Sequence, residues 1–182
     1  MIRPALPTEL PAVGDLRVAA YQADGYLSPS SSYAPRLRAL GTQADGTVLV
    51  AVRDNGELAG TIMLLPWPHT GELVRSPGDA EIRALAVAPE ARGQGLGRKL
   101  LLALLDLAAE QQVRNLLLAS LQAMRAAHHL YEQHGFTRMP ERDWTPEGGS
   151  GVLLVYGMRL PARDQGRDPA LTEAPGVGSD PL

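Results

Sequence analysis

The chain contains no cysteine, and this absence excludes three kinds of site. A disulfide framework, a zinc site built on thiolates and a cysteine nucleophile all require that residue. Other metal ligands are poorly arranged, because the best pair is His128 and Glu132, at i and i+4 of a helix-type segment. Two ligands do not make a site, so no metal is expected.

The sequence also lacks an apolar run of 18 residues, and it lacks a basic N-terminal segment followed by a long apolar stretch. Neither a membrane span nor a secretory signal is therefore expected, and a cytoplasmic location is predicted. The formal net charge is -3, whereas nucleic-acid binding needs clustered positive charge to displace counterions. We expect neither nucleic-acid nor membrane partners.

A chain of 182 residues with 45% hydrophobic residues is long enough for one domain with a substantial core. Residues 1–160 carry the apolar patterns of that domain. Residues 161–182 contain four prolines, three glycines and few apolar residues, so they cannot offset their own ordering entropy. This segment is predicted to be a flexible tail, with an arm that docks on a partner subunit as the alternative.

The apolar pattern predicts alternating strands and helices. Asn55-Gly56 lies between two β-type runs, 47–53 and 58–65, and this dipeptide favours a hairpin. The run 81–87 predicts a central strand that ends before Pro89, because proline cannot donate to a β-ladder. Helices are expected at 96–113 and 124–134, and further strands at 115–119, 136–139 and 151–160. Together these segments predict an α/β fold with a mixed sheet.

Three polar segments, 22–33, 66–79 and 140–150, are too rich in glycine, proline and serine for regular structure. Exposed loops of this kind often carry specificity, although solvated connectors have the same composition. Each contains aromatic residues, namely Tyr26, Tyr33, Trp67 and Trp144. The three loops are long enough to enclose a pocket.

The segment Arg92-Gly93-Gln94-Gly95-Leu96-Gly97 joins the central strand to the helix that follows. Glycines let backbone N–H groups converge on one point, and a helix N-terminus adds free donors and a positive dipole end. Phosphate or pyrophosphate is the expected ligand. The Walker A and dinucleotide spacings both fail, because Arg98 stands where each needs a different residue. A glycine-rich linker is the alternative, which the flanking strand and helix make weaker.

With the preceding Glu81-Ile82-Arg83-Ala84-Leu85-Ala86-Val87-Ala88-Pro89, the R-x-x-G-x-G segment resembles the acetyl-coenzyme A motif of GNAT N-acetyltransferases. A second block, the L-Y-E-x-x-G-F of residues 130–136, strengthens a resemblance that covers residues 1–160. It implies a single-domain, mixed and mostly antiparallel sheet flanked by helices, with a splayed central strand pair. It also implies acetyl-coenzyme A as cosubstrate, and a homodimer through the closing strands. The implied coenzyme-binding residues are Leu85, Ala86, Val87, Arg92, Gly93, Gln94, Gly95, Leu96, Gly97, Arg98 and Lys99.

Acyl transfer from a thioester to an amine needs a neutral nucleophile, a stabilised oxyanion and a protonated thiolate leaving group. The resemblance implies that Tyr131 is the acid and that the Val87 N–H stabilises the oxyanion. It also implies that Glu81 is the base. Simple packing is the alternative for Tyr131, and a polar strand entrance is the alternative for Glu81. One departure is Met124, where many relatives carry an asparagine that bonds the coenzyme.

The sequence therefore predicts an acetyl-coenzyme A-dependent N-acetyltransferase that acts on a primary amine. A small-molecule acceptor is favoured over a protein N-terminus or a lysine, because the three loops can enclose it. A non-catalytic acyl-coenzyme A-binding module is the rival interpretation. A serine hydrolase is disfavoured, since residues 148–152 read G-G-S-G-V and lack the final glycine of the nucleophile elbow.

Overall fold

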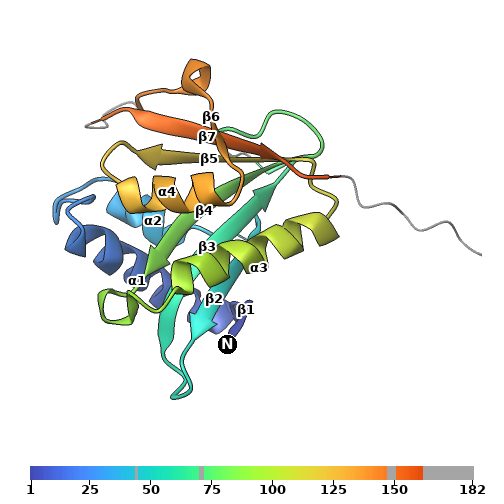
Figure 1. Cartoon of the computed structure of the whole chain (residues 1–182). Coiled ribbons are helices and arrows are strands. Elements are labelled where there is room, and N and C mark those ends of the chain that lie inside the picture. The colour runs from blue at the N-terminus through green and yellow to red at the C-terminus, as the bar shows by residue number, and fades with distance from the viewer. Residues whose placement is uncertain (44, 70–71, 147–150, 162–182) are drawn as a thin grey trace, which may run out of the picture.

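The structure, a computed structural model, describes residues 1–43, 45–69, 72–146 and 151–161. Seven strands form one sheet in the order β1-β2-β3-β4-β5-β7-β6 (Figure 1). The strands are β1 Ile2–Pro4, β2 Thr47–Val52, β3 Leu58–Pro66, β4 Asp79–Val87, β5 Asn115–Leu121, β6 Thr137–Arg138 and β7 Leu153–Arg159. The helices are α1 Leu10–Ala23, α2 Ala34–Ala39, α3 Leu96–Glu110 and α4 Arg125–Gln133, with 3-10 turns η1 Pro7–Glu9, η2 Pro89–Ala91 and η3 Pro140–Arg142.

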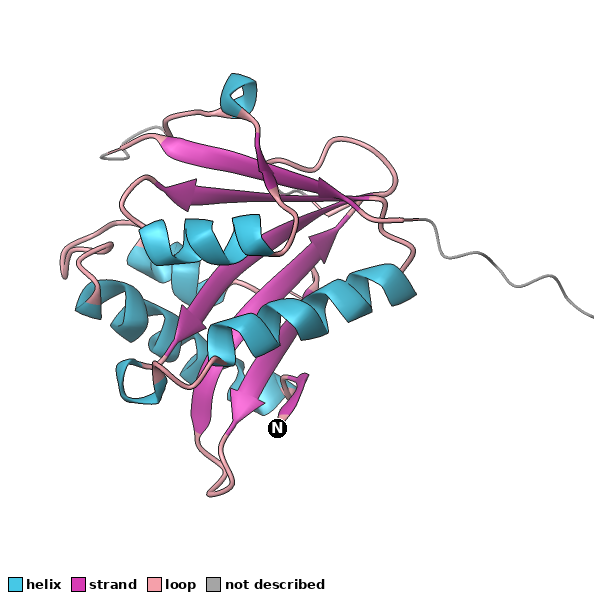
Figure 2. Ribbon diagram, in the orientation of Figure 1, coloured by secondary structure: helices cyan, strands magenta, loops and turns pink. Residues whose placement is uncertain are grey.

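All neighbouring strands are antiparallel except β4 and β5, which are parallel. The helices cover both faces of the sheet, as Figure 2 shows. The predicted mixed, mostly antiparallel sheet flanked by helices is therefore confirmed.

The tail expected after Leu160 lies almost wholly outside the described residues. Among those that are described, no helix combines the length and the apolar character needed to cross a membrane.

The core is split between the two faces of the sheet by the alternation of strand residues. In β2, Leu49 and Ala51 pack into the same cluster as Leu104 of α3. Val48 and Val50 point the other way and pack with Val13 of α1. This alternation holds α3 and α1 on opposite sides of the strands that carry the site.

The pairing of β4 with β5 is short. It runs only from Asp79 opposite Asn115 to Ile82 opposite Leu118. Beyond that point β4 continues beside β3 and β5 continues beside β7, so the two strands diverge (Figure 1). The predicted splay of the central strand pair is confirmed.

A backbone irregularity marks the start of the splay. The register between β3 and β4 shifts at Thr61 and Met63, and Ala84 opposite this shift has a φ of 52°. A left-handed alanine costs of the order of 1 kcal/mol, and such strain concentrates at functional sites. No sequence pattern indicated this bulge, because alanine has no preference for a left-handed backbone.

Two predicted boundaries were too generous. Helix α3 ends at Glu110 instead of residue 113, because Gln112 turns the chain with a φ of 58°. Strand β6 is limited to Thr137–Arg138, since Phe136 packs into the core before the strand begins. Neither difference changes the architecture.

Candidate functional site

A cavity of about 380 Å³ lies at the splay between β4 and β5. Its volume is within the range of sites for small molecules, which is about 300–1,000 Å³. Residues from all three predicted loops line it, including Tyr33, Glu72 and Trp144. The exposed Trp67, by contrast, is not among the lining residues.

Glu81 lies at the wall of this cavity, and only 2% of the residue is exposed. Its Oε2 accepts a hydrogen bond from the Leu73 N–H at 3.3 Å, and Arg142 in turn donates to the Leu73 carbonyl at 2.9 Å. Burial raises the pKa of the Glu81 carboxyl, and the nearby charge of Arg83 only partly opposes this effect. A carboxylate with a raised pKa is better suited to accept a proton near neutral pH.

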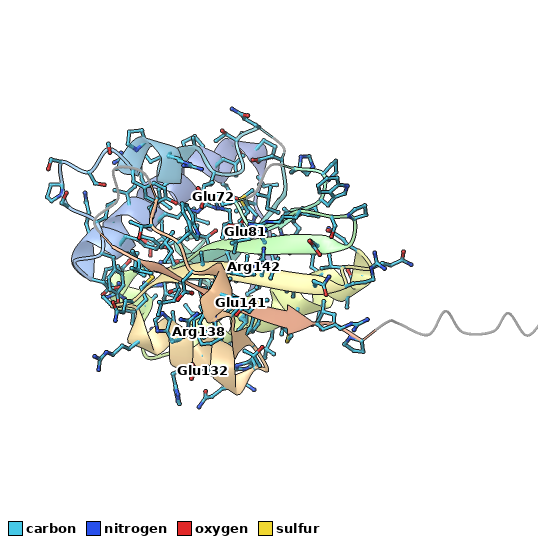
Figure 3. The ribbon with its side chains drawn as sticks, turned by 90° about the horizontal axis from the view of Figure 1, so that it is seen from above. Glu72, Glu81, Glu132, Arg138, Glu141 and Arg142 are labelled. Carbon is cyan, nitrogen blue, oxygen red and sulfur yellow. The ribbon has the colours of Figure 1, made fainter. Side chains whose placement is uncertain are left out.

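A second charge stands beside Glu81 on the same strand. Arg83 is two residues further along β4, and its Nε lies 3.6 Å from Glu81 Oε1. Glu72 is also close, as Figure 3 shows, and it forms a 2.8 Å salt bridge with Arg36. The cavity wall therefore holds charges of both signs.

Tyr131 is buried in α4 and packs within an aromatic group. The centroid of its ring lies 5.7 Å from that of Phe136 and 6.3 Å from that of Tyr156. Burial raises the pKa of its phenol, so the hydroxyl stays protonated, the state that a general acid needs. It is not among the residues that line the cavity, so the structure does not place Tyr131 and Glu81 in one pocket.

A serine and a histidine meet at the cavity without any sequence signal. The Ser120 hydroxyl at the end of β5 lies 3.1 Å from His128 Nε2 and 3.5 Å from the sulfur of Met124. Burial lowers the pKa of His128, so its imidazole is neutral near pH 7. The carboxylate of Glu132, one helical turn along α4 from His128, accepts a 3.5 Å hydrogen bond from Tyr156.

The glycine turn has the backbone that the motif predicts. Gly93 and Gly95 have φ values of 75° and 69°, and a Cβ built on either would meet no atom within 4 Å. Gly95 caps α3, and the first helical hydrogen bond runs from the Lys99 N–H to the Gly95 carbonyl. The N–H groups of Leu96, Gly97 and Arg98 therefore have no carbonyl partner within the helix.

The side chain of Arg92 is occupied elsewhere. It donates to both carboxylate oxygens of Asp24, at 2.7 and 3.0 Å, and to the Ala20 carbonyl at 3.3 Å. This contact ties the glycine turn to the C-terminal end of α1. Arg98 and Lys99 are exposed at the start of α3 and carry the free positive charge of the turn.

The sequence profile described as the Acetyltransferase (GNAT) family matches residues 11–136. A GNAT-family acetyltransferase from Staphylococcus aureus Mu50 is 16% identical, with a TM-score of 0.70 over 88% of this chain and 99% of that one. A ribosomal-protein-alanine N-acetyltransferase from Brucella melitensis is 25% identical, with a TM-score of 0.66 and the same coverage. The PaiA N-acetyltransferase from Thermoplasma acidophilum, solved with coenzyme A, is 17% identical, with a TM-score of 0.68 over 88% and 98%.

No curated protein sequence matches the chain. The family profile nevertheless covers well over half of the residues, and it includes the splayed strands and the glycine turn. The solved structures share the fold that these elements build. The chain therefore belongs to the GNAT family of acetyltransferases.

Proposed function

We propose that the protein is an acetyl-coenzyme A-dependent N-acetyltransferase whose acceptor is a primary amine on a small molecule. The observation that carries this proposal is the splay between β4 and β5. It brings together an unpaired strand edge, a turn with free N–H groups and a cavity with a buried glutamate. These features suit the binding of a coenzyme next to an amine and the removal of a proton from that amine.

The donor side of the site uses backbone groups. Past Ile82, the edge of β4 that faces β5 has no strand partner among the residues that the structure describes, so Leu85, Ala86 and Val87 can pair with an extended ligand that carries amides. The turn from Arg92 to Lys99 offers N–H groups and a helix N-terminus to a pyrophosphate. The open space beside Gly93 and Gly95 leaves room for the close approach of that group.

The chemical step assigns one role to each of three groups. Glu81 accepts a proton from the amine, whose nitrogen attacks the thioester carbonyl; the C–N bond forms as the C–S bond breaks. The Val87 N–H stabilises the oxyanion, and Tyr131 protonates the thiolate. Met124 lines the cavity but has no side-chain amide to bond a ligand, so binding of the coenzyme depends more on backbone groups.

The acceptor side favours a small molecule over a protein. Residues of all three loops close around the cavity, and a folded protein surface could not enter a space of about 380 Å³. A non-catalytic binding module would have no use for a buried carboxylate at this position, since burying Glu81 carries a desolvation cost. An N-terminal or lysine acetyltransferase is the alternative if only peptides are acetylated.

Glu81→Gln is expected to lower kcat/KM by about 10²- to 10⁴-fold, the contribution of a general base. Because the base must be deprotonated and burial raises the pKa of Glu81, wild-type activity should rise with pH through a pKa above 4.5. Coenzyme A thiol release across pH 5 to 9 measures both effects. Glu72→Gln removes a neighbouring carboxylate whose charge helps to raise the Glu81 pKa, so this variant should keep the fall in activity at acid pH but shift it to lower pH. Loss of this pH dependence in both variants would contradict the assignment.

Tyr131→Phe is expected to lower kcat by about 10²-fold while leaving the affinity for coenzyme A unchanged. The substitution keeps the ring that packs on Phe136, so the fold should be retained. Tyr156→Phe is the matched control, because it removes the hydroxyl of another buried tyrosine in the same aromatic group. Equal turnover in wild type and Tyr131→Phe would rule out the acid role of Tyr131 and make Ser120 the next candidate for the acid.

Gly95→Ala is expected to weaken coenzyme A binding by about tenfold or more, since a left-handed residue must gain a Cβ where the ligand approaches. Gly56→Ala is the control. Gly56 also has a left-handed φ, of 88°, and an added Cβ would meet no atom within 4 Å, but this glycine lies in the β2–β3 hairpin and not in the turn. Both variants should lose about 1 kcal/mol of stability. Calorimetry should show weaker binding for Gly95→Ala alone; equal affinities would refute the proposed role of the turn.

A further inference from the structure

Three arginines and two glutamates lie in or beneath the cavity. Arg36 and Glu72 neutralise each other through their 2.8 Å salt bridge. Arg83 faces Glu81 at the longer distance of 3.6 Å, and the fully buried Arg17 is near enough for its charge to interact with that of Arg83. Positive charge is therefore in excess before any ligand enters.

Arg83 has no hydrogen-bonded acid partner among the described residues, although the charges of Glu81 and Glu72 lie near it. Its side chain is 9% exposed and lines the cavity, and its one salt bridge among the described residues is to Glu81. That contact, to Oε1 of Glu81, is longer than a hydrogen bond, while Oε2 of the same carboxylate accepts from the Leu73 N–H. The guanidinium fork, which matches a carboxylate with two parallel hydrogen bonds, is left without an acid partner of its own.

Arg17 gives an independent indication. The residue is 0% exposed, and its Nη1 donates to the Leu40 carbonyl at 2.8 Å. Its Nε and Nη2 are buried without a hydrogen-bond partner in the described chain. An unpaired buried charge is costly, and an anion nearby would offset that cost.

The two arginines belong to one electrostatic group. The charge of Arg83 contributes to lowering the pKa of Arg17 to about 10, with burial as the larger cause. Tyr33 lines the cavity and raises the pKa of both guanidinium groups. Tyr21, one helical turn after Arg17, also lines the cavity. An anion at Arg83 would thus also be attracted by Arg17.

We infer that the acceptor carries a carboxylate beside its amine, as an amino acid does, and that Arg83 binds this carboxylate while Arg17 supports it. The inference rests on the proposed function, because it takes Glu81 as the partner of the amine. Glu81 and Arg83 approach to 3.6 Å, a spacing that suits an amine and a carboxylate joined through one carbon. A polyamine would bring more positive charge to a site where arginines already outnumber glutamates, and like charges select against it.

The test compares acceptors that differ only in the carboxyl group. Glycine, glutamate and phenylalanine are each assayed against their α-carboxamides, and phenylalanine also against phenethylamine, by thiol release from acetyl-coenzyme A. At least one amino acid is expected to exceed its amide by about 10- to 100-fold in kcat/KM, the range for a hydrogen bond to a charged group. If the amides or the plain amine are used as well as the amino acids, the inference is overturned.

Variants assign the preference to Arg83. Arg83→Met should abolish the preference for the acid mainly through KM, and Arg83→Lys should restore part of it. Arg36→Met is the matched control, because Arg36 also lines the cavity but is already paired with Glu72, and it should keep the preference. A preference that survives in Arg83→Met would refute the assignment.

A binding measurement separates failure of this inference from failure of the proposed function. If no amine is acetylated, amino acid and amide are titrated by calorimetry into the wild-type protein saturated with coenzyme A. Tighter binding of the amino acid, lost in Arg83→Met, would support the carboxylate site and reject acetyl transfer. Equal binding of both, or of neither, would overturn the inference.

Discussion

The interrupted ladder between β4 and β5 is the constraint on which the site depends. A strand edge in the middle of a sheet leaves backbone donors and acceptors without partners, which is normally a liability. Here β3 and β7 satisfy the outer edges of the two strands, and the inner edges separate after Ile82. In our proposal, an extended ligand that pairs with the free edge completes the sheet.

The donor and acceptor sides of the site are connected through α1. Arg92 fastens the glycine turn to Ala20 and Asp24 at the C-terminal end of this helix. The same helix carries Tyr21, which lines the cavity, and the fully buried Arg17. One short element therefore supports both the turn that binds the coenzyme in our proposal and the wall that faces the acceptor.

The parts of the site that the sequence could predict are those set by local backbone chemistry. Glycines with left-handed φ values, a proline that ends a strand and a helix start are recognisable from residue type and spacing. The three polar loops were also recognisable as the enclosure of a cavity. Glu81 and Tyr131 were identified through the resemblance, and their catalytic roles stay predictions.

The parts that could not be predicted depend on tertiary contacts. Ser120 and His128 meet because the end of β5 turns back into α4, and Arg17 comes near Arg83 because α1 packs against β4. The 3.6 Å approach of Arg83 to Glu81 follows from their shared strand face, which was visible, but not from any motif. Tyr156, from β7, packs on the His128 ring with centroids 5.3 Å apart and donates to Glu132, and neither contact has a local sequence signal.

Amide hydrogen exchange with and without coenzyme A tests the central claim most directly. If the free edge of β4 and the glycine turn hold the coenzyme, amides in segments 83–87 and 93–99 should exchange more slowly when it is bound. Amides of β7, Leu153–Arg159, serve as the internal reference and should not change. Tight binding of coenzyme A with no added protection in either segment would contradict the account.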